Sequence, residues 1–503
     1  MTSLENNLKI SFKGNHAFRK DVGRIRSKVI CTIGPRTAPT DKVGKLVEAG
    51  MNIARLNFSH GTHEYHASVI KNLRTYLAQS GRMCGIMLDT KGPEIRTGKL
   101  EGGIEIRVET GKTIVLTNDF SFVGNPSRIS HSYQNMHVSV SEGSEILIDD
   151  GLVSLTCVSV DEATGEVTCR VNNDGVIGET KGVNLPGASV DLPALTEKDK
   201  ADLKFGCEQR VDMVAASFIR KASDVTSIRE YLTLHGGENI EIISKIENQE
   251  GLENFDGVLA ESDGIMVARG DMGVEIPIEM VSVAQKMMIS KCNVAGKSVI
   301  TATQMLDSMI KNPRPTRAET TDVANAVLDG SDCVMLSGET AKGDYPVESV
   351  NTMVDICREA EKMLDYVYVF QSLRNHHREI DSISVTETIC SSAVKTAYDV
   401  KAALIVCLTE TGNTGRLVCK YRPVSPVICV TSNEMTARQM LLHRGAFPMV
   451  VGSMVGTESL IARVLSRSTT AGLAKKGDFI VLVSGMREGV SGGANILRVI
   501  KNE

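Results

Sequence analysis

Eight short apolar runs, separated by amphipathic helical patterns, occupy residues 25–340 of the 503-residue chain. The runs are almost continuously hydrophobic and rich in β-branched residues, as strands covered on both faces need to be. Strands that alternate with helices imply parallel pairing through right-handed crossovers. The runs span residues 28–34, 52–58, 85–90, 212–218, 240–246, 264–269, 297–303 and 332–337. Eight such units predict an α/β fold, a closed (β/α)₈ TIM barrel whose active site lies at the carboxyl ends of the strands.

The connection after the third run is unusually long. About a hundred residues separate this run from the next predicted helix, which starts near Thr196. The stretch is rich in Gly, Thr and Val, alternates with period two, and contains turn pairs such as Gly102-Gly103 and Asp150-Gly151. These features predict an inserted all-β domain. At the mouth of the barrel, such a domain would act as a lid that excludes water during reaction.

The pattern changes again beyond residue 365. An amphipathic helix is expected over 385–400, followed by buried strands at 403–408, 427–430 and 479–483 with helices between them. This pattern predicts a smaller open-sheet α/β domain. The expected organisation is an N-terminal segment 1–24, a first barrel segment 25–92, a lid 93–191, a second barrel segment 192–363 and a C-terminal domain 364–503.

Composition argues against several classes of protein. The net charge is −5 without a long run of one sign, which gives no support for nucleic-acid or membrane-surface binding. No apolar stretch approaches a membrane span and the first residues lack a signal-peptide core, so a cytoplasmic protein is expected. The 12 cysteines contain no Cys-x-x-Cys and lie mostly inside apolar runs, as buried thiols do in a reducing compartment.

Two neighbouring apolar runs end in charged residues. Lys245 and Glu247 end one run, and Arg269 and Asp271 end the next. Residues two apart in a strand point to the same side, so each pair is expected to share a face. Two carboxylates, a lysine and an arginine that converge at strand ends suit a divalent metal and an anionic ligand. An ion-pair network at the rim of the sheet is the structural alternative.

Further polar residues lie at the ends of the other predicted strands: Arg55, Asn57, Ser59, Asp89, Thr90, Thr303, Ser337 and Glu339. Two carboxylates suit Mg²⁺, which keeps some waters and shares its remaining positions with substrate oxygens. Lysine and arginine suit a phosphoryl group, and phosphoryl transfer needs little beyond positioning and electrostatic stabilisation. Asn57, Ser59, Asp89 and Thr90 offer only oxygen ligands, and one of these ligands is a carboxylate. That set could hold a monovalent cation, although hydroxyls at loop starts are often local caps.

Three weaker motifs favour ordinary structural roles. Residues 295–298 resemble the end of a P-loop, but the first glycine of that motif would fall at Lys291, so a helix cap is expected. His63 and His66 could form a zinc pair near His60, but without a third ligand a helix start is favoured. No Gly-x-Gly-x-x-Gly follows a strand, so a dinucleotide site has no support.

Seven segments of the chain resemble pyruvate kinase, and they occur in the order of that family. The segments are residues 51–61, 88–98, 243–248, 263–271, 302–306, 312–319 and 335–342. They include Ser-Lys-Ile-Glu-Asn at 244–248 and Leu-Ser-Gly-Glu-Thr-Ala-Lys at 336–342. The likeness continues through the third predicted domain to about residue 500. The chain is therefore identified as a member of this family on several ordered motifs rather than on one.

The resemblance implies an activity and a set of partners. The expected reaction is transfer of phosphate from phosphoenolpyruvate to ADP, giving pyruvate and ATP in the last step of glycolysis. Mg²⁺ and K⁺ are the implied cofactors, and Glu94 stands at a position where family members with Glu generally require K⁺. The resemblance further implies a lid domain, a regulatory C-terminal domain and a homotetramer.

The resemblance also assigns roles to residues at matching positions. The implied Mg²⁺ ligands are Glu247 and Asp271, and the implied catalytic residues are Lys245, Arg55 and Thr303. The implied phosphoenolpyruvate site consists of Arg55, Lys245, Ala268, Arg269, Gly270, Asp271 and Thr303. The implied K⁺ ligands are Asn57, Ser59, Asp89 and Thr90, and the nucleotide side comprises Asn57, His60, Arg96 and Lys181. Ser337 and Glu339 are implied members of the network near the enolate.

One loop of the third predicted domain departs from the family pattern. Its candidate effector residues are Thr409, Thr411, Gly412, Asn413 and Thr414, at a strand-to-helix turn that suits an anion. Glu410 stands where relatives activated by fructose-1,6-bisphosphate often carry Lys, so weak or no activation by that sugar is expected. A monophosphosugar, or no effector, is the alternative. Met272 and Asp307 also differ from the common pattern, but neither has an implied role.

Two other functions stay open at this point. One is a Mg²⁺-dependent aldolase or lyase on a similar barrel, which would need no ADP and would leave Arg96 and Lys181 without a role. The other is a catalytically silent homologue that only binds ligands. The intact set of Lys245, Glu247 and Asp271 argues against a silent protein.

Overall fold

The computed structural model describes residues 25–376, 383–485 and 493–502, so the predicted N-terminal segment 1–24 lies outside the described residues. The chain divides into two compact units. One comprises Met1–Leu88, Val211–Met213 and Met288–Glu503, and the other comprises Asp89–Arg210 and Val214–Met287. Contacts are therefore described within each unit.

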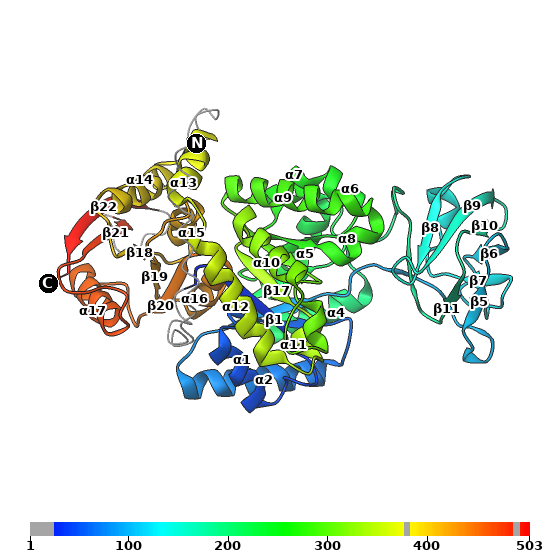
Figure 1. The fold of residues 1–503 in the computed structure, drawn as a ribbon, viewed down its shortest axis with the longest axis horizontal. Coiled ribbons are helices and arrows are strands. Elements are labelled where there is room, and N and C mark those ends of the chain that lie inside the picture. The colour runs from blue at the N-terminus through cyan, green and yellow to red at the C-terminus, as the bar shows by residue number, and fades with distance from the viewer. Residues whose placement is uncertain (1–24, 377–382, 486–492, 503) are drawn as a thin grey trace. The chain divides into compact units, whose positions relative to one another are not determined.

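Eight parallel strands form a closed barrel in the order β1-β17-β16-β15-β14-β13-β3-β2 (Figure 1). Their bounds are β1 Lys28–Thr32, β2 Ile53–Asn57, β3 Gly85–Asp89, β13 Met213–Ala216, β14 Glu241–Ile246, β15 Gly264–Ala268, β16 Ser298–Ala302 and β17 Cys333–Leu336. Nearly every residue of these strands is buried, which explains their continuous apolar sequences. Each strand lies inside one of the eight predicted runs, and the predicted fold class is confirmed.

Helices connect the barrel strands. They are α1 Thr40–Ala49, α2 His63–Ser80, α4 Glu197–Glu208, α5 Ala222–Leu234, α6 Gln249–Glu253, α7 Phe255–Glu261, α8 Arg269–Glu275, α9 Val281–Ala295 and α10 Arg317–Asp329, and α11 Gly338–Ala341 and α12 Pro346–Lys362 follow the last strand. Helix α13, Tyr366–His376, contributes Phe370 and Leu373 to a hydrophobic core of the C-terminal domain. Helix α4 begins with a capping box in which the Thr196 hydroxyl accepts from the N–H of Asp199 and Asp199 bonds back to Thr196. Helix α10 ends at Gly330, whose φ of 112° is accessible to glycine at little cost.

An Asn or Asp precedes every second barrel strand and pairs it with the strand before. These residues are Asn52, Asp212, Asp263 and Asp332, and their partners are Val29, Ile86, Ile242 and Val299. Each Asn or Asp donates its N–H to the partner's carbonyl at 2.8–3.0 Å. Its side-chain oxygen accepts the N–H of the same partner at 2.8–3.1 Å. The two bonds satisfy buried backbone groups and fix the register at the amino-terminal end of each strand pair.

One local prediction is wrong. Arg269 and Asp271 were expected to share a strand face, but β15 ends at Ala268 and both residues lie in the first turn of α8. Residues two apart in a helix point in different directions, since successive side chains are about 100° apart. Asp271 therefore reaches its neighbours from a helix.

The inserted segment is all β except for short turns such as α3, Met136–Ser139. Its strands are β4 Ile95–Arg96, β5 Ile106–Val108, β6 Thr113–Thr117, β7 Arg128–Ser130, β8 Glu145–Ile148, β9 Val153–Asp161, β10 Glu166–Val171, β11 Gly175–Ile177 and β12 Gly182–Asn184. Seven form a sheet in the order β4-β12-β8-β9-β10-β6-β7, and β11 pairs with β5. The inward residues Ile114, Ile146 and Val167 belong to its own hydrophobic core.

The C-terminal domain is an open five-stranded sheet in the order β20-β19-β18-β21-β22. Its strands are β18 Leu404–Leu408, β19 Val427–Thr431, β20 Ala446–Val450, β21 Phe479–Gly485 and β22 Ala494–Lys501, with helices α14 Val385–Asp399, α15 Asn413–Lys420, α16 Glu434–Gln439 and α17 Thr457–Thr470. The three predicted strands are present. The two edge strands, β20 and β22, were not predicted, and β22 runs antiparallel to β21.

The described helices include none that is both long enough and apolar enough to cross a membrane.

Candidate functional site

A buried charged cluster lies at the carboxyl ends of β3, β13 and β14. Lys245 Nζ lies 2.9 Å from Glu247 Oε1 and 3.3 Å from Asp89 Oδ1. It donates to Ser217 Oγ at 2.7 Å, and Ser217 Oγ in turn donates to the Thr90 carbonyl at 2.6 Å. The predicted shared face of Lys245 and Glu247 is thus present. The cluster brings together four predicted site residues and one, Ser217, that was not predicted.

Glu247 is only 1% exposed and is incompletely satisfied by the protein. Its Oε2 accepts the N–H of Phe218 at 2.5 Å. Its Oε1 forms an ion pair with Lys245 Nζ at 2.9 Å and accepts no further hydrogen bond from the described residues. The pKa of Glu247 is raised to about 8, chiefly by burial; Lys245 opposes this change and the charge of Asp271 adds to it. A buried carboxylate close to a second carboxylate is a site that favours a cation, because the cation stabilises the charged form of both.

Together with burial, the charge of Asp271 also raises the pKa of two more carboxyl groups, those of Asp150 and Glu275. Burial raises the pKa of Asp150, and Asp271 is the next largest cause. The pKa of Glu275 is also raised, first by burial and then by Asp271, although Asn184 Nδ2 donates to Glu275 Oε1 at 2.7 Å. This concentration of negative charge around Asp271 would be relieved by a cation. Over the described residues, no group of three or more His, Cys, Asp or Glu side chains is arranged as a metal site.

A cleft of about 330 Å³ connects Asp271 with the inserted β domain. Arg96 and Lys181, both predicted on the nucleotide side, line this cleft. Arg96 donates to Glu94 Oε2 at 2.7 Å and to the Thr180 carbonyl at 2.7 Å. Lys181 Nζ lies 2.8 Å from Asp149. The two cations therefore have fixed positions from which they could meet an anionic ligand.

The other unit carries further predicted residues. Arg55, a residue of β2 that is 8% exposed, donates to Thr32 Oγ1 at 2.9 Å. Asn57 Oδ1 accepts the N–H of Ser59 at 3.1 Å, and the Asn57 carbonyl accepts the N–H of His60 at 3.3 Å. The turn after β2 thus holds Asn57, Ser59 and His60 together.

The loop after β16 has an unusual backbone. Thr303 has φ 69° and Gln304 has φ 54°, both in the left-handed region that β-branched and long side chains rarely adopt. Glu339, 1% exposed, braces this loop by accepting the N–H of Leu306 at 3.1 Å and that of Ser337 at 2.7 Å. Strain that is held in place in this way is characteristic of functional sites.

The other substrate-side residues lie at the junction of β15 and α8. Ala268 ends β15 and is buried, and Arg269 and Gly270 begin α8. Arg269 Nη1 donates to Gln285 Oε1 at 3.3 Å.

His66 makes contacts of a structural kind. His66 Nε2 lies 2.9 Å from the His60 carbonyl, and its ring stacks on Phe58 with centroids 4.0 Å apart. His63 begins helix α2. The preference for a helix start over a zinc pair agrees with these contacts.

The candidate effector loop joins β18 to α15. Gly412 is the N-cap of α15 with φ 83°, a left-handed conformation suited to glycine. Thr409 and Thr414 are buried at 4% and 6% exposure, whereas Thr411 is exposed. The loop has the predicted strand-to-helix geometry.

Two residues that contribute to the cluster were not predicted from the sequence. Ser217 and Phe218 follow β13, at a strand end like the others, but neither carries a charge that would single it out. Phe218 acts through its backbone N–H and has φ 56°.

A closed parallel barrel with buried charge at its strand ends, and a cleft running from Asp271 to an inserted β domain, define a barrel enzyme with a polar site. The family model "Pyruvate kinase, barrel domain" matches residues 24–350, and "Pyruvate kinase, alpha/beta domain" matches residues 387–500. A pyruvate kinase of Dictyostelium discoideum is 56% identical over 482 residues, covering 95% of this chain and 94% of that protein. A cytosolic isozyme of pyruvate kinase from Glycine max is 47% identical, covering 95% and 96%.

A crystal structure of a pyruvate kinase from Cryptosporidium parvum superposes with a TM-score of 0.93 at 45% identity, covering 96% of this chain and 98% of that one. The chain belongs to the pyruvate kinase family, and the protein is a phosphotransferase. Membership implies phosphoenolpyruvate and ADP as substrates, pyruvate and ATP as products, and a divalent metal as cofactor.

Proposed function

We propose that this enzyme catalyses the last step of glycolysis in the cytoplasm, transferring the phosphoryl group of phosphoenolpyruvate to ADP with Mg²⁺ and K⁺. The observation that carries the metal assignment is Glu247, a buried carboxylate that pairs with Lys245 and interacts electrostatically with the like charge of Asp271. A cytoplasmic location is supported by relatives described as cytosolic isozymes.

Glu247 and Asp271 are the proposed Mg²⁺ ligands. Mg²⁺ usually takes one or two carboxylates from the protein and fills its shell with water and substrate oxygens. A site with two protein carboxylates agrees with this coordination better than a site closed by three or more protein ligands would. When bound, the ion would neutralise charge on the phosphoryl oxygens.

Lys245 and Arg55 are the proposed partners of the phosphoryl group during transfer. Lys245 is held by Ser217 and Asp89, and Arg55 by Thr32. Fixed cations stabilise developing charge without reorganising at the moment of reaction. Thr303 completes the proposed catalytic set, and Ala268, Arg269, Gly270 and Asp271 complete the substrate site.

Arg96 and Lys181 are the proposed contacts for the phosphates of ADP, and Asn57 and His60 are further proposed nucleotide-binding residues. Their support is the cleft that both cations line together with Asp271. Asn57, Ser59, Asp89 and Thr90 are the proposed K⁺ ligands, in keeping with Glu94 rather than a lysine next to Arg96. A lysine at this position could replace the charge of the ion.

We further propose a homotetramer in which the C-terminal domain is regulatory. The proposed effector site is the loop containing Thr409, Thr411, Gly412, Asn413 and Thr414. In the barrel, Ser337 and Glu339 are proposed to lie near the enolate. The exposed Thr411 and the first turn of α15 support one phosphate at this loop.

Titration of activity against Mg²⁺ tests the metal assignment. Glu247→Gln and Asp271→Asn each remove an anionic ligand, so each should raise the half-saturating Mg²⁺ concentration. Glu253→Gln is a matched control, because Glu253 is exposed and accepts a hydrogen bond from Gln249 on the same helix, α6. An unchanged Mg²⁺ requirement in both test variants would place the metal elsewhere.

A further inference from the structure

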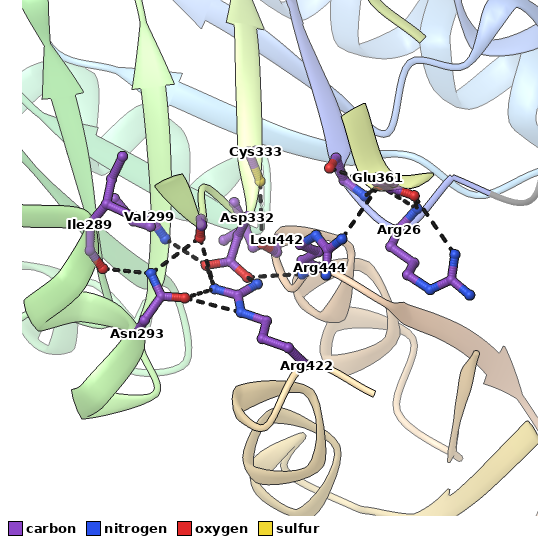
Figure 2. Close-up of polar contacts among 12 residues, drawn as sticks. Arg26, Ile289, Asn293, Val299, Asp332, Cys333, Glu361, Arg422, Leu442 and Arg444 are labelled. Carbon is purple, nitrogen blue, oxygen red and sulfur yellow. Dashed lines mark hydrogen bonds and ion pairs between the residues drawn. The ribbon is translucent and has the colours of Figure 1, made fainter. Parts of the chain in front are cut away.

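Two of the four residues that pair the barrel strands also bind arginines of the C-terminal domain. Asp332 Oδ1 accepts from Arg422 Nη1 at 2.7 Å and from the backbone N–H of Arg444 at 3.1 Å, as Figure 2 shows. Asp212 Oδ1 accepts from Arg438 Nε at 2.8 Å, and the Asp212 carbonyl accepts from Gln439 at 3.0 Å. The C-terminal domain therefore holds the barrel at residues that set strand register.

The other two pairing residues make different contacts. Asp263 bonds to Arg229, which lies on the barrel helix α5. Asn52 carries no charge and accepts the N–H of Val29. The arginine contacts of Asp212 and Asp332 are thus an addition to the repeated strand pairing.

Arg422 is held tightly in an unfavourable conformation. Its φ is 50°, a left-handed value that a residue with a Cβ rarely adopts. The side chain is buried, and besides Asp332 it bonds to Asn293 Oδ1 at 3.0 Å and to the Gly330 carbonyl at 3.0 Å (Figure 2). A conformation of this kind persists only where its surroundings determine it.

Helix α15 connects Arg422 with the candidate effector loop. The helix begins after Gly412 and ends at Lys420, two residues before Arg422. It also rests on the turn before β16, where Arg416 Nη1 donates to the Gly296 carbonyl at 3.0 Å. A displacement of the loop would therefore move a short, braced helix that is followed, two residues beyond its end, by Arg422, the residue that bonds Asp332.

Helix α16 makes a second connection from the same loop. The Glu410 carbonyl accepts from Thr436 Oγ1 at 3.1 Å, and Thr436 lies on α16 two residues before Arg438. Gly412 packs on the same segment, since a Cβ at Gly412 would lie 3.0 Å from Met440 Sδ. The loop thus touches two helices. Arg438 lies on α16 and Arg422 follows the end of α15, and each of these arginines bonds to a strand-pairing aspartate.

The strands that begin at these aspartates end in the site. Asp332 precedes β17 and Ser337 follows this strand. The backbone N–H of Ser337 donates to the Glu339 carboxylate, which also accepts the N–H of Leu306. Asp212 precedes β13, and Ser217 follows that strand and accepts from Lys245. A strand of four residues hydrogen-bonded on both sides shifts as a unit, because slippage would break its ladder.

We propose that Arg422 and Arg438 are positioning residues for phosphoryl transfer. By holding Asp332 and Asp212 they keep the ends of β17 and β13 in place, and they connect both strands to the loop containing Gly412. The inference rests on the roles proposed above for Lys245 and its neighbours.

Steady-state kinetics of the full-length protein test this proposal. Arg422→Gln and Arg438→Gln should each raise the half-saturating phosphoenolpyruvate concentration by roughly fivefold or more, the lower end of typical coupling between sites. Arg438→Lys should recover part of the loss because one contact suffices there, whereas Arg422→Lys should not, since lysine cannot reproduce the fork that reaches three partners. Arg498→Gln is the control, because Arg498 bonds Glu458 on the surface of the same domain.

A structural role alone would give a different result. Loss of folded protein lowers the maximal rate and the melting temperature but leaves the half-saturating concentration unchanged. If Arg422→Gln does not fold, Asp332→Asn replaces it, because the amide oxygen can still accept the Val299 N–H while the charge on Arg422 loses its partner. Folded variants whose phosphoenolpyruvate saturation matches the wild type would overturn the proposal.

A change in the loop itself supplies the second test. Gly412→Ala forces a Cβ against Met440 in a left-handed backbone, so it should raise the half-saturating phosphoenolpyruvate concentration in the same direction. In the Arg422→Gln, Arg438→Gln double variant it should add nothing, since effects carried by one connection are not additive. Full additivity would show that the loop does not act through these arginines. The activity of the wild-type protein tests the proposed function, whereas the arginine variants test the positioning role. Either proposal can therefore fail without the other.

Discussion

Lys245 is the residue on which the proposed chemistry most directly depends. The substitution Lys245→Met should lower kcat by raising the activation free energy by about 3 kcal/mol. That is the cost of removing one preorganised contact to the charge that develops in the transition state. The measurement is kcat of a variant whose circular dichroism shows a native fold. Lys200→Met, at an exposed ion pair with Glu197, is the matched control. Near-normal kcat in folded Lys245→Met would contradict the assignment.

His443 makes stability depend on pH. Burial lowers the pKa of His443 from 6.5 to about 4, although Asp332 opposes the change. Between these values the unfolded chain binds a proton that the folded protein excludes, so stability is complete above pH 6.5 and falls as pH drops toward 4. Because one pKa unit corresponds to 1.36 kcal/mol, the loss can reach about 3 kcal/mol.

Urea unfolding at pH 7 and pH 4.5 measures this effect. His443→Gln should show a smaller decrease in the free energy of unfolding between the two pH values than the wild type. An equal decrease in both proteins would mean that other groups dominate.

Individual site residues were predictable where charge interrupts an apolar run. Lys245, Glu247 and Asp89 stood out for that reason, and all three meet in one cluster. Ser217 was missed because a serine at a strand end looks like an ordinary cap. The N–H of Phe218 carries no sequence signal, since every residue except proline has one.

At the level of elements, the paired Asn and Asp residues should contribute to stability. Asn52→Ala removes the acceptor for the buried N–H of Val29, so the free energy of unfolding should fall by about 1–3 kcal/mol. Denaturant unfolding measures the change. Asn52→Asp, which keeps an oxygen at that position, should lose less. Equal losses in both variants would show that the hydrogen bond is not the source of the stabilisation.

Strands and helices were predictable in proportion to the strength of their patterns. The eight barrel strands are buried on both faces and therefore read as continuous apolar runs. The start of α8 was missed because the polar sequence Arg-Gly-Asp after β15 carries no helical periodicity. Strand β20 contains Pro448, which is tolerated because β20 is an edge strand, and β22 is an edge strand with charged residues.

At the level of the whole molecule, the proposed regulation concerns the loop containing Glu410. A carboxylate a few ångströms from a second phosphate costs about 1–4 kcal/mol at a partly hydrated site. Fructose-1,6-bisphosphate should therefore activate weakly or not at all, with glucose 6-phosphate the favoured effector if one acts. Phosphoenolpyruvate saturation curves with each sugar measure this. A large leftward shift with micromolar bisphosphate would contradict the interpretation of Glu410.

The most direct test of the whole account is pyruvate formation by the purified protein from phosphoenolpyruvate. We predict that pyruvate and ATP appear in equal amounts, and that omission of ADP or of Mg²⁺ stops both. Lys245→Met, measured in parallel, should form neither product at an appreciable rate. Release of pyruvate without ADP, or the absence of ATP formation by the folded wild-type protein under these conditions, would contradict the account.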